Sequence, residues 1–572
     1  MKNQLYFLLF FIICLLTYSC KTDNQPVTYP IEKSIIDDTA MVVSPHPLAS
    51  AIGTSILKEG GNAVDAAIAV QLAIAVVYPR AGNIGGGGFM VIRNADGSTD
   101  ALDYREKAPA AADRDMYLDS TETVIPGLSQ KGHLAVGVPG TVAGMFAAHQ
   151  KYGQLQDFGQ LIQPAIELAQ KGYHISAREA ERFNQFKEAI EAQNDDPIPF
   201  VKNTPWQTGD LLQQPELAAT LERIKTDGQA GFYGGKTADL IVAEMQEGNG
   251  LITKEDLANY QAVWRKPITG QYKDYRIISM PPSSSGGVAL VQMLDMIESQ
   301  PIDDWRFQST ETIHLMVEAM RRAYADRAEH LGDMDFYDVP IDSLLNINYL
   351  NDRMATYTPD SATVSDQIAS GEFTIQVESF ETTHTSIVDG QGNAVSVTTT
   401  LNSNFGSKVV VDGAGFFLNN EMDDFSAKPG VPNQFGLVGA EANAIAPGKR
   451  MLSSMTPTII EKDGKLFMVL GSPGGSTIIT SVLQVFLNVA EFGMNLEEAV
   501  NAKRFHHQWL PDAIITEEGA FPDSIHQTLL ALGHDIKTRK RMAVVKAIHC
   551  LPDGRLQGVG DYRNPDDDVE GY

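Results

Sequence analysis

The most constraining feature of the chain is the segment 62–77 (NAVDAAIAVQLAIAVV), which is almost wholly apolar and rich in alanine. A helix of this composition has no polar face to present to water, so it must be buried on most sides. A second helical pattern runs from Ser309 to Arg327, where apolar residues recur at spacings of three and four. It predicts an amphipathic helix that lies on a core, with Ser309 or Thr310 as its N-terminal cap.

The last third of the chain has the pattern of a sheet. Two β-branched runs at 385–388 and 394–400 are separated by DGQGN, which predicts a hairpin. A second hairpin is expected from 458–461 through a turn at 462–464 and back along 466–470. Sheets of this kind, flanked by buried helices, indicate a layered α/β fold rather than an all-β sandwich.

The first hairpin has a register that brings two hydroxyl groups together. If Val388 pairs with Ala394, then Thr382 lies directly opposite Thr400, with the side chains about 5 Å apart. Threonine is a common strand residue, so this pairing alone is weak evidence for a function.

Composition limits the class of protein. The chain has 572 residues, of which 43% are apolar and 20% charged, so it is long enough to bury a large core. It contains no internal repeat, which favours one compact fold. The formal charge of -28, from 44 basic and 72 acidic residues, argues against a nucleic-acid partner, since phosphate contacts need clustered Lys and Arg.

The N-terminus has the pattern of an export signal. A lysine precedes an apolar run at 5–16, which is shorter than the about 20 residues that span a bilayer. Cys20 follows a small residue, as in a bacterial lipoprotein signal, although Tyr18 fits that pattern less well. We expect a signal peptide at 1–19, a lipidated tether at 20–34 and a periplasmic or cell-surface protein that meets the membrane only through this anchor. The alternative is a plain secreted protein.

The cysteines and histidines give no sign of a metal or cofactor. The chain contains Cys14, Cys20 and Cys550, so loss of the signal and lipidation would leave Cys550 alone and exclude an intramolecular disulfide. Cys550 precedes a turn and is expected to be a small packed side chain. No Cys/His spacing suggests zinc. The adjacent His506 and His507 point different ways on a regular element, so packing or hydrogen bonding is their expected role.

A glycine- and serine-rich segment can stabilise an anion. GSPGGSTIIT, at 471–480, ends a strand and opens an apolar helical stretch, so the amides of Gly474 and Gly475 would point at whatever lies above them. Such amides form an oxyanion hole. A phosphate-binding loop is the competing interpretation, but it requires a lysine after the glycines. The glycine run at 85–88 lacks GxGxxG order and indicates close backbone packing.

Several long motifs occur in a fixed order. They are TTH at 382–384, LNSNFG, LNNEMDDFSAKPG, LSSMTPTI, GSPGG and RFHHQWLPD, with PRAGNIGGGGFMVIR and DYREKAPAAA further upstream. Together they resemble the gamma-glutamyltransferase (gamma-glutamyl transpeptidase) family from about residue 35 to the C-terminus. Each motif is weak alone, but their number and order make coincidence implausible.

The resemblance implies an N-terminal-nucleophile fold, a four-layer αββα sandwich made as one precursor. The precursor would be cut between Glu381 and Thr382 into a large subunit, 35–381, and a small catalytic subunit, 382–572, which remain paired in one intertwined fold. The Thr382 hydroxyl would attack the Glu381 carbonyl, and water would resolve the resulting ester.

The resemblance also implies the reaction. The freed α-amine of Thr382, with an ordinary pKa of about 7.7–8.0, would act as the base for the hydroxyl of the same residue. Thr382 would attack the γ-carbonyl of a glutathione-like donor, and the amides of Gly474 and Gly475 would stabilise the oxyanion. The gamma-glutamyl group would then pass to water or to an amino acid or dipeptide. No cofactor is implied.

Substrate recognition is implied by the matching positions of the motifs. A free glutamyl end has an α-carboxylate and an α-ammonium, and both must be matched in a small pocket. Arg105 would clamp the carboxylate, with Ser453 and Ser454 as further donors. The predicted acceptors for the ammonium are Asn402, Glu421 and Asp424. Thr400 would hydrogen-bond the nucleophile.

Two departures from the family pattern affect these expectations. Phe435, in a lid loop at 429–439, stands where an aromatic hydroxyl is often found, so it cannot hydrogen-bond Asn402, and looser gating is expected. GDYR at 560–563 replaces the usual Ser-Asp-Pro-Arg, which puts fine support of the site in doubt.

Two alternatives remain open on sequence alone. A related acylase that removes glutaryl groups from a cephalosporin would share the fold and the self-cleavage, but its substrate offers no cation to Glu421 and Asp424. An uncleaved, non-catalytic binding or structural lipoprotein is the alternative of another class.

Overall fold

The computed structural model describes residues 28–195, 197–365 and 382–572. The signal peptide, Cys20 and Glu381 lie outside the described residues, so export, lipidation and the subunit boundaries stay predictions. Within the described part of the chain, no helix is long and apolar enough to cross a membrane.

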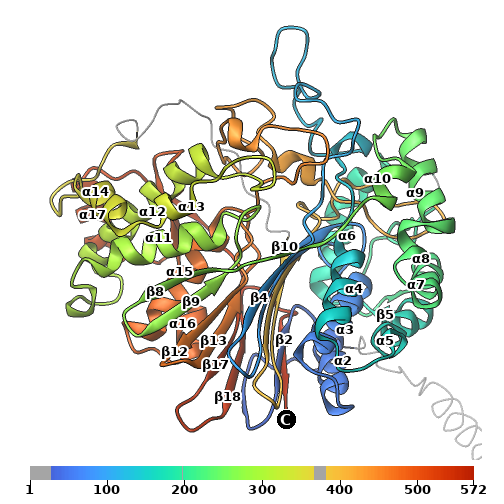
Figure 1. The fold of residues 1–572 in the computed structure, drawn as a ribbon, viewed down its shortest axis with the longest axis horizontal. Helices are drawn as coiled ribbons and strands as arrows, with labels where there is room; N and C mark the ends of the chain where they lie inside the picture. Colours follow the sequence, from blue (N-terminus) through green and yellow to red (C-terminus); the bar gives the residue numbers. More distant parts are fainter. Residues whose placement is uncertain (1–27, 196, 366–381) are drawn as a thin grey trace, which may run out of the picture.

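Two seven-stranded sheets face each other at the centre of the molecule (Figure 1). All their strand pairs are antiparallel. The first sheet has the order β1 (Ser34–Asp37), β18 (Leu556–Gly560), β17 (Lys546–Cys550), β13 (Lys465–Gly471), β12 (Thr458–Lys462), β9 (Tyr275–Ser279) and β8 (Ile268–Tyr272). The second has the order β19 (Asp568–Gly571), β2 (Met41–Ser44), β10 (Thr382–Val388), β11 (Ala394–Thr400), β3 (Gly87–Arg93), β4 (Thr99–Asp103) and β7 (Val263–Arg265).

A buried apolar layer joins the two sheets. Alternate residues of each strand point to one face of a sheet, and the inward-facing ones pack together here. Members of this layer include Met41, Val43, Phe89 and Val91 from the second sheet and Ile278, Ile459, Val469 and Ile548 from the first.

Helices cover the outer face of each sheet, as Figure 1 shows on the right and left. The second sheet is covered by α2 (Pro47–Lys58), α3 (Ala63–Val77), α4 (Thr141–Tyr152), α5 (Phe158–Lys171), α6 (Ala177–Glu191), α7 (Pro215–Asp227), α8 (Ala230–Tyr233), α9 (Gly235–Glu247) and α10 (Lys254–Ala258). The first is covered by α11 (Gly286–Glu298), α12 (Thr310–His330), α13 (Ile341–Leu344), α14 (Ile347–Met354), α15 (Thr477–Ala490), α16 (Leu496–Asn501) and α17 (Asp523–Ala531). The result is the predicted αββα arrangement.

Short elements lie outside these four layers. They are the pair β5 (Tyr173–His174) and β6 (Leu211–Leu212), the small sheet of β14 (Phe505–His506), β15 (Ile514–Glu517) and β16 (Ile536–Arg539), and the 3₁₀ turns η1 (His133–Ala135), η2 (Ile302–Asp304), η4 (Glu421–Asp424) and η5 (Glu441–Asn443).

The apolar segment that constrains the sequence forms α3, and every one of its residues is buried. One side of α3 packs on β10 and β11, and α2, α4 and α5 cover the rest. Asn62 caps the helix by accepting hydrogen bonds from the amides of Val64 and Asp65, and the Asp65 carboxylate accepts from the Asn62 amide in return. The helix therefore supports the two central strands of the second sheet from behind.

The second predicted helix is α12, with Ser309 as its cap. The expectation that it is amphipathic is only partly met, because both its apolar and its polar side chains are buried from Thr312 to Ala328. The polar side is covered by residues 356–365: the Thr363 amide donates to Glu318, and Arg322 donates to Thr356. A polar helix face can be buried in this way when ion pairs satisfy its charges.

Both predicted hairpins are present. In the first, Val388 pairs with Ala394 and Thr382 with Thr400, which is the predicted register. In the second, β12 pairs with β13 around a turn at Asp463 and Gly464, with one irregularity between Ile460 and Glu461.

The burial of α3 predicts a large difference between two isoleucine substitutions. Ile68 is fully buried in α3, whereas Ile347, at the start of α14, is 54% exposed. Ile68→Ala should cost about 2–5 kcal/mol, because it removes buried methyl groups and leaves a cavity. The matched control Ile347→Ala should leave stability nearly unchanged. Urea-unfolding midpoints from circular dichroism check this, and equal midpoints for the two variants would contradict it.

Candidate active site

Two threonines meet at one edge of the second sheet. Thr382 begins β10 and Thr400 ends β11, so they lie opposite each other. The Thr382 hydroxyl donates to Thr400 Oγ1 over 3.5 Å, and the Asn402 amide donates to the same Oγ1 at 2.7 Å. Thr382 is 7% exposed. The hairpin register therefore holds a shielded hydroxyl in a fixed position at the end of a strand.

A small pocket opens onto this pair. The predicted site residues that line it are Arg105, Thr382, Thr400, Asn402, Glu421, Asp424, Ser453, Ser454 and Gly475. Gly474 does not line the pocket but precedes Gly475. The other lining residues are Arg327, Phe435, Leu437, Met455 and Ile478. Segments separated by more than 300 residues in sequence thus converge on one small volume.

Strand and helix ends hold these residues in place. Arg105 follows β4, where its amide donates to the Asp103 carboxylate at 3.0 Å. Asn402 follows β11 with a φ of 74°, a left-handed conformation that asparagine tolerates better than most residues. Its side-chain amide donates to the Asn420 carbonyl at 3.0 Å, next to η4, which carries Glu421 and Asp424.

The serines come from a segment that runs towards β12. The Ser453 amide donates to the Ser283 carbonyl at 2.9 Å, and the Ser285 amide donates back to the Ser453 carbonyl at 2.8 Å. This reciprocal pairing fixes Ser453 and Ser454 against the N-terminal end of α11. Both serines thereby line the pocket.

The buried charges of the pocket are concentrated around Arg105. Its guanidinium lies 2.7 Å from Glu421 and 3.6 Å from Glu106, and it donates a hydrogen bond to Asp424. Burial opposes the charge of Arg105, yet Glu421 and Asp424 raise its pKa. Burial also raises the pKa of Glu106, Glu421 and Asp424, which the arginine only partly offsets. One cation is therefore shared by three carboxyl groups, of which Glu106 and Glu421 are fully buried and Asp424 is partly exposed.

The turn before α15 provides the predicted backbone donors. Gly474 and Gly475 have φ values of 139° and 55°, which favour glycine, and α15 begins at Thr477. Within the described part of the chain, neither amide has a hydrogen-bond partner. Gly475 lines the pocket beside Thr382, at the end of a helix whose dipole favours negative charge.

Comparison with known proteins identifies the family. A family model described as Gamma-glutamyltranspeptidase matches residues 49–570. The chain belongs to this family. It is 46% identical over 553 residues to the Glutathione hydrolase proenzyme of Escherichia coli (strain K12), covering 96% of this chain and 95% of that protein. A protein this similar to the family over nearly its whole length is an enzyme of the gamma-glutamyltranspeptidase family.

Two solved structures show the same fold. The cephalosporin acylase from Bacillus halodurans matches with a TM-score of 0.80 at 27% identity, over 96% of this chain and 100% of that chain. The gamma-glutamyltranspeptidase of Helicobacter pylori matches with a TM-score of 0.57 at 48% identity, over 60% of this chain and 97% of that chain. The predicted N-terminal-nucleophile fold is therefore confirmed.

The loop at 429–439, predicted to be a lid, is held by hydrogen bonds that do not involve the Phe435 side chain. Ser403 donates to the Gln434 side chain at 3.0 Å, and the Gln508 side chain donates to the Phe435 carbonyl at 3.3 Å. The Phe435 ring lies so close to Gly475 that a Cβ there would be 3.0 Å from it. The ring packs against Gly475, and a phenyl ring cannot hydrogen-bond Asn402. Looser gating stays a prediction.

The segment at 560–563, which departs from the family pattern, contributes an acid that forms several buried contacts. Asp561 is buried and forms ion pairs with Arg504 at 2.9 Å and Arg563 at 3.0 Å, and it also accepts from the Val545 amide at 3.0 Å. Arg504 in turn donates to the carbonyl of Ala543, which packs against Gly474. The acid and the arginine of the family pattern therefore still brace the glycine turn.

The adjacent histidines have the packing role predicted for them. His506 is buried within hydrogen-bond distance of Thr480 and Gln508, and burial lowers its pKa to about 3. His507 lies 3.2 Å from Asp512. Neither lines the pocket.

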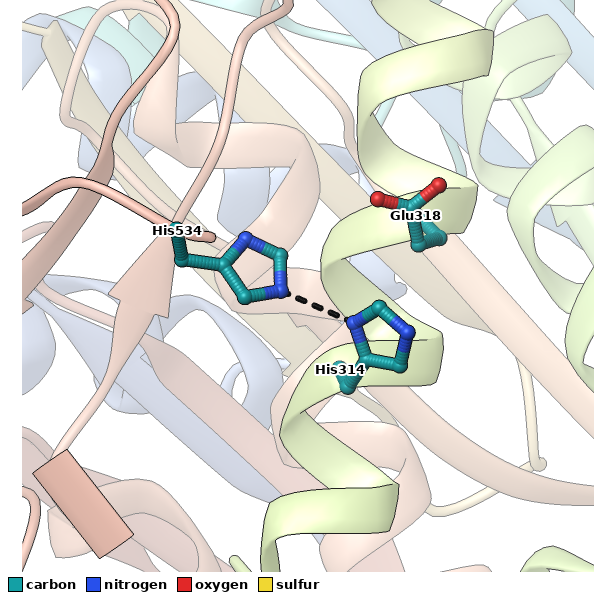
Figure 2. Close-up of side chains that lie close together, drawn as sticks. All are labelled: His314, Glu318 and His534. Carbon is teal, nitrogen blue, oxygen red and sulfur yellow. Dashed lines mark hydrogen bonds between the residues drawn. The ribbon is translucent and has the colours of Figure 1, made fainter. Parts of the chain in front are cut away.

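A second cluster, formed by His314, Glu318 and His534, has ligand atoms within 4.8 Å of one another (Figure 2). His314 and Glu318 project from α12, and His534 follows α17. His314 Nε2 faces the Thr358 carbonyl at 2.8 Å and so carries a proton, which leaves Nδ1 to accept from His534 Nε2–H at 2.8 Å.

The third member of this cluster is already neutralised. The Glu318 carboxylate accepts a hydrogen bond from Arg322 at 2.5 Å and another from Arg321 at 3.4 Å. The His314 and His534 imidazoles hydrogen-bond each other, and two guanidinium groups hold the Glu318 carboxylate. We therefore assign the cluster to hydrogen bonding between α12 and the C-terminal region. A metal ion would have to displace these partners.

Sequence reasoning missed one charged residue of the pocket, Arg327. It is the last residue of a predicted amphipathic helix, and the sequence pattern gave its side chain no role. The signal that was present is ADR at 325–327, an arginine beside small residues, which is compatible with close packing but does not specify a pocket.

The His314–His534 pair predicts a loss of stability in acid. Burial, with His314 and Arg321 nearby, lowers the pKa of His534 to about 3 from 6.5. The unfolded chain thus binds more protons between these values, so the stability present above pH 6.5 is lost as the pH falls towards 3, by at most about 1.4 kcal/mol per unit. His534→Gln should make the urea-unfolding midpoint less dependent on pH between 7 and 5. The control His526→Gln, in α17, should retain the wild-type dependence, and an unchanged slope in His534→Gln would refute the assignment.

Proposed function

We propose that the protein transfers gamma-glutamyl groups from glutathione and related donors to water or to amino-acid and peptide acceptors, through an ester on Thr382. The observation that carries this proposal is the pocket itself. It combines a threonine hydroxyl at the start of a strand with an arginine and buried carboxyl groups that match the two charges of a glutamyl end. The E. coli relative is a glutathione hydrolase and the H. pylori relative a gamma-glutamyltranspeptidase, which supports the same activity.

We infer that the active form arises by self-cleavage between Glu381 and Thr382. The Thr382 hydroxyl would add to the Glu381 carbonyl, and the C–N bond would break to give an ester on Thr382 and a free α-amine. Water would then hydrolyse this ester to the Glu381 carboxylate and the Thr382 hydroxyl. Three observations support this step. The E. coli relative is named a proenzyme, the H. pylori chain covers 60% of this chain, and Thr382 stands at the first position of β10.

In the transfer reaction, the free α-amine of Thr382 accepts the proton of its own hydroxyl as Oγ attacks the γ-carbonyl carbon of the donor. The amides of Gly474 and Gly475 stabilise the oxyanion. Collapse breaks the donor's C–N bond, and the proton passes to the leaving amine. Water or an acceptor amine then attacks the ester and releases Thr382. Thr400 orients the Thr382 hydroxyl towards the donor carbonyl through a hydrogen bond.

Donor binding exchanges one set of charge pairs for another. In the empty pocket Arg105 is paired with Glu421 and Asp424. A glutamyl end is a zwitterion. Its ammonium can pair with Glu421 and Asp424, while its carboxylate pairs with Arg105 and accepts hydrogen bonds from Ser453 and Ser454. The net charge of the buried pocket does not change, which avoids the cost of an uncompensated charge.

A related acylase activity is the second candidate, favoured by the fold match to the cephalosporin acylase. A glutaryl group lacks the ammonium and would add a negative charge beside Glu106, Glu421 and Asp424. Because an unpaired buried charge is strongly disfavoured, the pocket selects glutamyl over glutaryl donors. An uncleaved, non-catalytic protein is the remaining alternative, and the exposure of a new N-terminal Thr382 distinguishes it.

Replacement of the nucleophile tests the processing step. Thr382→Ala should remain a single chain and have no activity, because it lacks the attacking oxygen. Thr382→Ser should be cut, although more slowly. Wild type should give two pieces of roughly 40 and 20 kDa on a denaturing gel, from about 110 Da per residue, as an N-terminal nucleophile requires. Two pieces from Thr382→Ala would disprove the assignment.

Replacement of Asp424 tests the substrate class. Asp424→Asn should lower kcat/KM for gamma-glutamyl-p-nitroanilide by about tenfold to a hundredfold through a higher KM, because it removes a charged partner of the α-ammonium. Its activity on glutaryl-p-nitroanilide should not fall. A wild-type enzyme that prefers the glutaryl anilide would favour the acylase instead.

A further inference from the structure

A second arginine lies in the wall of the donor pocket. Arg327, near the end of α12, is 5% exposed and lines the pocket with Ser454 and Asp424. Its Nε donates to Ser285 Oγ at 3.0 Å and its Nη2 donates to Ser454 Oγ at 3.2 Å. The Ser285 hydroxyl in turn donates a hydrogen bond to the Ser453 carbonyl at 2.7 Å. Arg327 is therefore tied to both serines predicted to bind the donor's α-carboxylate.

Arg327 has no anionic partner of its own. Among the described residues, 28–195, 197–365 and 382–572, no carboxylate oxygen lies within 4.0 Å of an Arg327 guanidinium nitrogen, the distance limit for an ion pair. By contrast, the other fully buried large arginines are each paired with a carboxylate: Arg105, Arg321, Arg322, Arg450 and Arg504. A buried guanidinium without a counter-ion is costly, so its retention beside an open pocket points to a ligand that supplies the missing charge.

We infer that Arg327 is a positioning residue for the α-carboxylate of the gamma-glutamyl donor and that it acts through the hydroxyl of Ser454. This inference rests on the proposed function. Because Arg327 donates to Ser454 Oγ, the oxygen's acceptor capacity is used by the arginine and its hydrogen is free to point into the pocket. The hydroxyl becomes a better donor to a carboxylate when a cation polarises it.

The charges of the pocket give Arg327 a task that Arg105 cannot perform alone. Arg105 is shared by Glu106, Glu421 and Asp424, so little of its positive charge is left to attract a second anion. Arg327 supplies positive charge on the serine side, where the carboxylate is expected. The donor's carboxylate would thus lie between two arginines, one in direct contact and one behind Ser454.

The test compares two donors that differ only in the α-carboxylate: gamma-glutamyl-p-nitroanilide and 4-aminobutanoyl-p-nitroanilide. In Arg327→Gln the ratio of kcat/KM for the first donor over the second should fall by about tenfold to a hundredfold, mainly through the KM of the glutamyl donor. Arg327→Lys, which retains the charge, should recover part of the ratio. Inhibition by free glutamate should weaken in parallel, whereas inhibition by 4-aminobutanoate should not.

The matched control is Arg322→Gln, on the same helix, where the arginine is paired with Glu318 and does not line the pocket. It should change kcat/KM for both donors by the same factor. If Arg327→Gln also lowers both donors equally, the residue only holds α12 against the serine segment and the inference is overturned.

Ser454→Ala carries the test if Arg327→Gln is not processed. It should lower the donor ratio as Arg327→Gln is expected to, and adding Arg327→Lys to it should cause little further loss, because both act on one hydrogen bond. Additive losses would refute action through Ser454. A wild-type protein that cleaves neither anilide would instead overturn the proposed function, a result distinct from any failure of the variants.

Discussion

The antiparallel pairing of β10 with β11 is the constraint on which the rest of the site depends. It places Thr382 opposite Thr400. The turn after β11 then brings the Asn402 amide to the Thr400 hydroxyl. A slip of one residue would turn the Thr382 side chain to the opposite face of the sheet. The register is secured on both sides, since β2 and β3 flank the pair and the fully buried α3 packs against it. A buried, mostly apolar helix therefore supports the strands that carry the polar site.

Charge is the second organising principle of the pocket. Buried carboxyl groups outnumber the arginine they contact, and a further arginine lies on the serine side without a carboxylate of its own. A site arranged in this way is best completed by a ligand with one positive and one negative group a short distance apart. The fold itself is compatible with several acyl donors, as the structural match to a cephalosporin acylase illustrates. Discrimination between glutamyl and glutaryl groups would then lie in these few charged side chains.

Contacts between segments on either side of the undescribed residues 366–381 extend well beyond the pocket. Ser365 donates to the Trp509 carbonyl at 2.8 Å, the Ala362 amide donates to the Leu532 carbonyl at 2.7 Å, and His314 pairs with His534. The two central sheets also contain strands from both segments. A break of the chain between Glu381 and Thr382 would leave all these contacts in place, which is a physical basis for subunits that stay together.

The sequence by itself determined the local elements: the buried helix at α3, the two hairpins, the register that places Thr382 opposite Thr400 and the glycine turn before α15. These follow from side-chain periodicity and backbone preferences, which act over a few residues. The ordered motifs also identified the family and most of the pocket residues. Only the tertiary structure decided that the polar face of α12 is buried, that Arg105 is shared by three carboxyl groups and that Arg327 lies in the pocket without one. Periodicity cannot show this, because burial and charge pairing depend on partners hundreds of residues away in the chain.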